Sequence, residues 1–212
     1  MKFSTVVFAA SLLVLPACQK SEISDKPAAE VTESATASAA SDSASATDTS
    51  LTSNQSAANA VTANVIKEKS SIGWVGAKVT GDHTGKFNAF DGTIEYVAAK
   101  PTRIAFEIDM NSIESDNEKL TGHLKSADFF DVAKFPKATF VSTSLTEAPA
   151  GSQGGTTHLL RGTLDLHGVK KEVSIPVVAT QGADGVRAKS EFTINRHDWG
   201  VSYKGMTDDL IK

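Results

Sequence analysis

Histidine and aspartate side chains are the groups in this chain that could carry acid–base or metal chemistry. The five histidines are scattered, and none is spaced as a metal-ligating pair with another histidine or with cysteine: His83, His123, His158, His167 and His197. No nucleophile elbow, phosphate-binding loop or Cys–His pair occurs. Asp128 and Asp131 flank two phenylalanines, where aspartate commonly caps or turns the chain. We therefore predict no catalytic residue and no metal site.

A polar and aromatic run at 195–199 is a further candidate. Its sequence is Asn-Arg-His-Asp-Trp. The simpler interpretation is that Arg196 and Asp198 form an ion pair or a turn at a strand end. The alternative is that they contact the head group of a ligand at the rim of a pocket.

The one cysteine, Cys18, lies where a covalent modification is expected. It follows Lys2 and an apolar stretch at 3–15. This stretch is too short to span a bilayer, which takes about 20 helical residues, and has the length of the apolar part of a signal peptide. The residues Leu-Pro-Ala-Cys that end at Cys18 resemble the bacterial lipobox, despite the unusual proline. We expect 1–18 to be a lipoprotein signal peptide; the alternative is an ordinary secretory signal.

Acylation of Cys18 would attach several alkyl chains to one residue. Several chains anchor a protein stably where one chain does not, because each buried CH₂ contributes about 0.8 kcal/mol. The next residue is Gln19 rather than aspartate. By resemblance to enterobacterial lipoproteins, this favours the outer membrane, so we expect a lipid-anchored protein of the periplasm.

Residues 19–63 are rich in serine, alanine and threonine and contain no aromatic residue. Such a segment buries too little apolar surface to offset the entropy of ordering it. We expect a flexible tether with a reach on the order of 35–40 Å. From Val65 onward basic and acidic residues nearly balance, so the tether accounts for most of the net charge of −4. The absence of a basic stripe argues against nucleic-acid binding.

From Val65 the apolar residues alternate with polar ones, a period of two that predicts strands. In 103–111, for example, Ile104, Phe106, Ile108 and Met110 share one face. Turn signals separate the runs, at 81–82, 100–101, 149–155, 167–168 and 182–185. The predicted strands are 71–79, 86–97, 103–111, 138–145, 160–167, 172–177 and 191–195. The fold class is therefore all-β, with an antiparallel sheet closed as a barrel or folded as a sandwich.

Two features interrupt this pattern. Residues 117–136 carry Leu120, Leu124, Phe129 and Phe130 among charges, and predict a short helix and loop across the sheet. Pro176 lies inside a predicted strand, which indicates an edge or a bulge there.

Four stretches carry a family resemblance. They are 85–92 (GKFNAFDG), 122–140 (GHLKSADFFDVAKFP, then ATF), 162–173 (GTLDLHGVKKEV) and 192–201 (FTINRHDWGV). In this order and spacing they resemble the YceI family over about 64–212. The resemblance implies a lipocalin-like antiparallel barrel of eight strands whose elongated interior holds a polyisoprenoid, such as a quinone tail, or another long amphiphile. It also implies a periplasmic location, no established catalytic residue, and homodimers that pack at their open ends.

One departure concerns the C-terminus. In the family, a segment like 206–212 leads into a final strand, whereas this sequence stops there. A barrel without that strand would expose edge backbone. We expect a fragment or an early stop.

A barrel of about eight strands is either filled by side chains or holds one small ligand, and the sequence leaves both open. If it holds a lipid, inward apolar residues are the candidate ligand contacts, with no other cofactor: Phe87, Phe90, Ile94, Ile104, Phe106, Ile108, Phe129, Phe140, Leu164, Ile175, Phe192, Ile194 and Trp199. The favoured function is lipid sequestration or transport without chemistry. The alternatives are an envelope structural or stress protein with a filled core, and an enzyme acting on an isoprenoid lipid.

Overall fold

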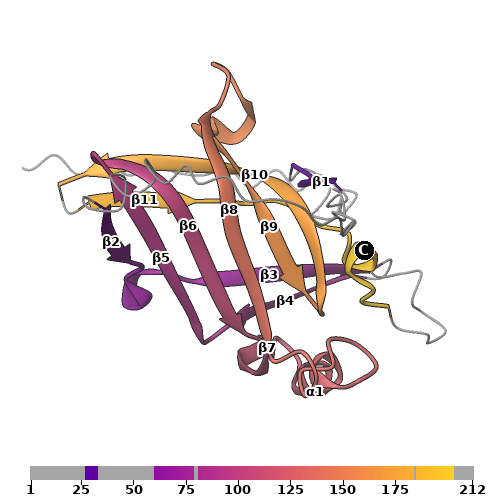
Figure 1. The fold of residues 1–212 in the computed structure, drawn as a ribbon. Coiled ribbons are helices and arrows are strands. Elements are labelled where there is room, and N and C mark those ends of the chain that lie inside the picture. Colours follow the sequence, from indigo (N-terminus) through magenta and orange to yellow (C-terminus); the bar gives the residue numbers. More distant parts are fainter. Residues whose placement is uncertain (1–26, 33–59, 79–80, 184, 203–212) are drawn as a thin grey trace, which may run out of the picture.

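A computed structural model of the protein describes residues 27–32, 60–78, 81–183 and 185–202. Its strands form two antiparallel sheets (Figure 1). The large sheet follows the order β1 (Glu30–Thr32), β10 (Val169–Gly182), β9 (His158–Leu166), β8 (Lys137–Glu147), β6 (Lys100–Asp109), β5 (Phe90–Val97) and β2 (Ala60–Asn64), and β11 (Gly185–Lys189) pairs with β10. The small sheet consists of β3 (Ile72–Lys78), β4 (Gly81–Phe87) and β7 (Ile113–Ser115).

The two sheets form two layers. In Figure 1 the strands β3 and β4 run across those of the large sheet, and β7 and α1 (Glu118–Lys125) lie at its lower end. Among the described strands the two sheets do not pair edge to edge. The predicted all-β antiparallel class is confirmed, but the sheets do not close into one continuous barrel.

Turn chemistry explains some connections and not others. The predicted turn at His167-Gly168 is confirmed, because both residues have positive φ (53° and 75°) between the paired Leu166 and Val169. Such two-residue turns match the twist of a hairpin. The turn predicted at 100–101 is wrong: both residues belong to β6, and the turn lies at Ala98-Ala99 (φ 48° and 61°).

Three further predictions need correction. The strand predicted at 86–97 is broken at Asn88-Ala89, where the chain passes from the small sheet to the large one. The turn predicted at 81–82 lies inside β4, because Gly81 already pairs with Lys78 of β3. The strand predicted at 191–195 is reduced to an isolated bridge at Thr193, followed by a 3₁₀ turn, Arg196–Trp199.

The helix and loop predicted at 117–136 are confirmed. The Asn117 side chain accepts a hydrogen bond from the Leu120 backbone N–H and so caps α1. Leu124 of the helix and Phe129 and Val132 of the loop that follows it lie in the core.

Pro176 lies where it interrupts little. One edge of β10 pairs with β9 along 169–177. The other edge pairs with β1 at 172–174 and with β11 at 178–182, and Pro176 falls between them. The missing proline N–H therefore lies at a gap in the pairing.

Strands also occur inside the range expected to be a tether. β1 lies within 19–63 and β2 begins within it, and each pairs with the large sheet. Residues 27–32 and 60–63 are therefore part of the sheet rather than of a flexible tether, and the rest of 19–63 lies outside the described residues.

Asp116, which lies between β7 and α1 in the chain, joins β4 to β7. Its carboxylate accepts hydrogen bonds from His83 Nδ1 (2.9 Å), the Thr84 backbone N–H (3.2 Å) and Ser115 Oγ (2.9 Å). These bonds, that of His83 first, hold the pKa of Asp116 below its usual value. Bonding to the charged form is the physical cause.

We expect Asp116→Asn to lower the stability of the protein at neutral pH. A carboxyl whose pKa is lowered by folding stabilises the fold above its unfolded pKa, and this contribution is lost as the pH falls through the folded value. The stability difference between the two proteins should therefore be constant near neutrality and shrink below about pH 4. Thermal unfolding across pH measures it; a difference that persists in acid would contradict this role.

Candidate functional site

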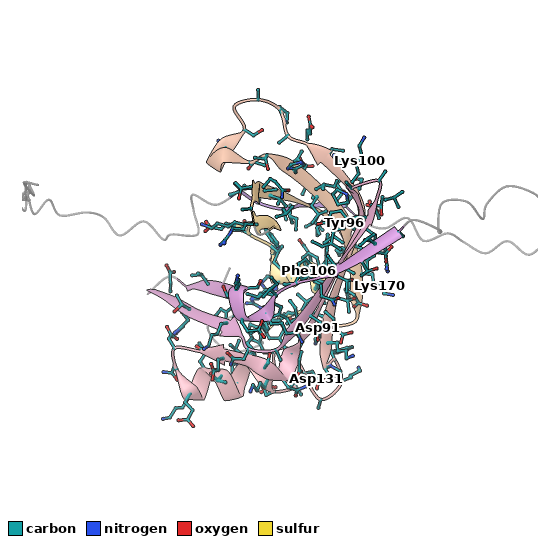
Figure 2. All side chains as sticks on the ribbon, turned by 90° about the vertical axis from the view of Figure 1, so that its left-hand side faces the viewer. Asp91, Tyr96, Lys100, Phe106, Asp131 and Lys170 are labelled. Atoms are coloured by element: carbon teal, nitrogen blue, oxygen red, sulfur yellow. The ribbon has the colours of Figure 1, made fainter. Side chains whose placement is uncertain are left out.

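One face of the large sheet is apolar and the other is charged. The registers place Ile94 opposite Ile104, Phe90 opposite Ile108, and Phe106 opposite Phe140. Phe140 is in turn opposite Leu164, and Ile175 continues the same face on β10. We call this set of eight apolar residues the inner wall. Figure 2 labels Phe106 near the middle of the molecule, among the side chains between the sheets.

The opposite face carries ion pairs between neighbouring strands. Arg103 Nη1 lies 2.9 Å from Glu95 Oε1, and Lys137 Nζ lies 2.7 Å from Glu107 Oε1. Hydrogen bonding to Glu107 is the main cause that raises the pKa of Lys137. The outer face of this sheet is therefore charged, and its inner wall makes apolar contacts.

Aromatic rings of the wall lie against glycines of the neighbouring strand. A Cβ atom built on Gly92 would come 2.7 Å from the ring of Phe106, and one on Gly162 would come 2.5 Å from the ring of Phe140. Trp74 of β3 lies in the same way against Gly85 of β4. Because these rings cover backbone, they line the sheets instead of standing across the space between them.

Burial divides the predicted contact residues into two groups. Five of them are buried: Phe90, Phe129, Phe140, Ile175 and Trp199. Phe87, Ile104, Phe106, Ile108, Leu164 and Ile194 pack against the core but remain only half-buried, and Ile94 is also half-buried. The inner wall thus keeps accessible apolar surface that protein side chains do not cover.

Two predicted residues lie away from this arrangement. Phe192 is 37% exposed and is not packed against the core. Trp199 is 0% exposed, and its Nε1 donates to the Leu164 carbonyl at 3.2 Å. Trp199 is a packed part of the fold rather than an accessible contact surface.

Arg196 lies in the same packed turn as Trp199. Its Nη1 donates to the Val201 carbonyl at 2.6 Å, and its guanidinium lies 5.1 Å from the centre of the Phe129 ring. Arg196 is buried and holds the turn Arg196–Trp199 against the core. For the run 195–199, the structure thus shows the predicted turn and not a contact surface at the rim of a pocket.

Trp74 is a candidate site residue that was not predicted from the sequence. This residue packs against the core, and its indole N–H is buried with no acceptor within the described part of the chain. A buried donor without a partner is uncommon and costs free energy. The alternation of Ile72 and Trp74 with polar or small neighbours in β3 could have indicated it, but not its missing acceptor.

A surface cavity of about 550 Å³ opens near the connection of β4 and β5. Phe87 and Phe90 contribute to its lining together with charged residues, including Lys67, Lys86 and Asp91. Lys67 Nζ also pairs with Asp91 Oδ1 at 2.5 Å. This charged lining does not suit a long apolar chain.

The histidines take part in local contacts. His83 bonds Asp116, His158 Nδ1 lies 2.8 Å from Thr157 Oγ1, and the His167 ring centre lies 4.4 Å from that of Phe135. In the described ranges, no three His, Cys, Asp or Glu side chains gather closely enough to hold a metal ion. No helix of the described segments has the length and apolarity to span a membrane. Cys18 lies outside the described residues.

Comparisons with known proteins agree on one family. A family model described as YceI-like domain matches residues 64–212. A UPF0312 protein of Pseudomonas savastanoi pv. phaseolicola is 36% identical over 135 residues, which cover 60% of this chain and 68% of that protein. A UPF0312 protein of Shewanella denitrificans is 37% identical over 127 residues, covering 55% and 63%.

One solved structure shares the fold. The crystal structure of BcnA from Burkholderia cenocepacia matches with a TM-score of 0.60 and 24% identity, over 69% of this chain and 91% of that one. A polyisoprenoid-binding domain from Saccharophagus degradans matches with a TM-score of 0.49 and 20% identity, over 62% and 76%. The latter likeness is too weak to bear on the ligand of this chain.

Gly92→Ala and Gly162→Ala should each destabilise the protein by about 1–3 kcal/mol, because the new methyl group collides with the Phe106 or Phe140 ring. Gly122→Ala is the matched control, since nothing lies within 4 Å of its added Cβ in α1. The control should be neutral or more stable by up to about 1 kcal/mol, as alanine favours helix. Urea unfolding measures all three; equal stabilities would contradict the ring–glycine packing.

Proposed function

Since the chain belongs to the YceI-like family, we propose that it binds a polyisoprenoid or similar long-chain amphiphile against its inner wall and sequesters or carries it without chemical change. The observation that carries this proposal is the accessible apolar surface of the wall. Ile104, Phe106 and Leu164 lie on the face that should be the most buried, yet remain half-buried. A bound apolar chain would remove that surface from water.

The energetics suit a hydrocarbon chain. Burying one five-carbon isoprene unit contributes up to about 4 kcal/mol. A few units are enough for tight binding even after the entropy of association is subtracted. Such a site needs apolar walls and a small number of polar groups that orient the ligand.

Trp74 is the polar group that we assign to this role. A carbonyl oxygen on the ligand would accept the hydrogen bond that the buried indole N–H lacks within the described part of the chain. This favours a head group such as a quinone over a plain hydrocarbon end. Trp199 supplies the contrast, because its N–H already bonds the Leu164 carbonyl.

The anchor at Cys18 completes the proposal. The lipobox-like sequence before Cys18 supports acylation, and Gln19 supports the outer membrane as the destination. The protein would then act in the periplasm, next to the membranes that hold such lipids.

We expect Trp74→Phe to weaken quinone binding about 5–10-fold, the effect of losing one hydrogen bond, and to leave the affinity for a polyprenyl hydrocarbon almost unchanged. Trp199→Phe should instead lower folding stability without discriminating between the two ligands. Titration of purified variants with both lipids measures this. An equal loss for both ligands in Trp74→Phe would mean that the ring acts by packing alone.

The full chain, expressed in a bacterial periplasm, should carry about one isoprenoid per protein. Native mass spectrometry and organic extraction would identify the bound molecule. A different long amphiphile would retain the binding function but exclude the isoprenoid. A protein that is empty and takes up no added quinone or prenol would favour a filled-core envelope protein, and turnover of a prenyl substrate would favour an enzyme.

A further inference from the structure

Six residues that precede the family domain are part of the fold. The family match begins at residue 64, whereas 27–32 already pair with the large sheet. The Ala29 N–H donates to the Thr193 carbonyl at 2.8 Å, and the Thr193 N–H donates to the Pro27 carbonyl at 2.9 Å. Next to these bonds, β1 pairs antiparallel with residues 172–174 of β10. We call 27–32 the closing segment.

The closing segment has the alternation of an edge strand with one buried face. Ala29 is 8% exposed and belongs to the core, and Val31 packs against that core. Glu30 and Thr32 are exposed. The segment thus reaches the core as well as the backbone of its neighbours.

It lies at a seam in the large sheet. β11 pairs with residues 178–182 of β10, and β1 covers residues 172–174 of the same edge. On its other side the segment bonds Thr193, so it lies between β10 and the stretch that precedes Arg196–Trp199. Releasing the segment would expose the part of the core that Ala29 covers and would free the edge of β10.

We propose that the closing segment is a detachable strand that seals this seam, and that the lipid enters and leaves through the seam when the segment is released. The proposal rests on the lipid-binding function above. A strand of three residues at the edge of a sheet opens more easily than the central strands, because it has few buried contacts.

The position of the segment in the chain ties the seam to a lipid surface. Only residues 19–26 separate it from Cys18. A chain of this length spans at most about 30 Å, because an extended residue covers about 3.3–3.6 Å. An acylated Cys18 would hold the seam within that distance of the membrane, where lipid is exchanged.

A reversible lock tests the proposal. In the full chain carrying Cys18→Ser, Glu30→Cys and Ser174→Cys place thiols at directly opposed positions of β1 and β10. Opposed antiparallel residues lie about 4.5–5.5 Å apart at Cα, a separation that a disulfide accepts. Thr62→Cys with Glu95→Cys, opposed in β2 and β5 at the other edge of the sheet, is the matched control.

We expect the oxidised lock to slow release of a fluorescent polyprenyl quinone at least tenfold, with normal release after reduction. The oxidised control should release the probe at the normal rate. Val31→Asp, which puts a charge against the core, should accelerate release instead.

Three outcomes would overturn the proposal. Failure of the lock to form while the control forms would show that the segment does not dock. A lock that forms without slowing release would show that lipid leaves elsewhere. A protein that binds no probe even when the lock is reduced would overturn both the gating and the proposed function, and so differs from the first two results.

Discussion

The division of the large sheet into an apolar face and a charged face is the constraint on which the rest of the structure depends. Side chains alternate strictly along a strand, so the register that brings Phe106 opposite Phe140 also brings Glu107 opposite Thr139. A slip of one residue would exchange the faces of a strand, burying its charges and exposing its apolar residues. The register therefore fixes the position of the inner wall. It also fixes the ion pairs on the opposite face and the side on which the small sheet packs.

The wall departs from an ordinary core in how its space is filled. Interiors are usually close-packed, and a half-buried inner face forgoes part of the hydrophobic stabilisation. Here glycines accept the rings of Phe106, Phe140 and Trp74, which brings these bulky residues close to the backbone. The departure is local, because Ile113, Trp199 and Val201 are almost completely buried. A fold that is well packed at Trp199 but open along Phe106 is consistent with a binding face supported by a rigid end.

The sequence was sufficient where one local pattern decided the structure. Strict alternation identified β6 and β9, and His167-Gly168 identified the tight turn that joins β9 to β10. It was insufficient where the partner of a strand mattered. The 86–97 run looks continuous, yet Asn88-Ala89 divides it between two sheets. Residues 191–195 alternate like a strand, but alternation reports a face and not a neighbour, and only Thr193 forms a bridge.

The same limitation explains why the binding features were only partly foreseen. Apolar alternation placed Ile104, Phe106 and Leu164 on one face, but it could not say which residues would stay accessible. The buried N–H of Trp74 and the core position of Ala29 depend on what lies across space, and composition gave no signal for either. Ala29 stands in a serine- and alanine-rich segment whose average predicts a tether. Two apolar residues two apart, Ala29 and Val31, are enough to dock such a segment when a sheet offers an uncovered edge, so a low-complexity composition does not by itself exclude a structural role.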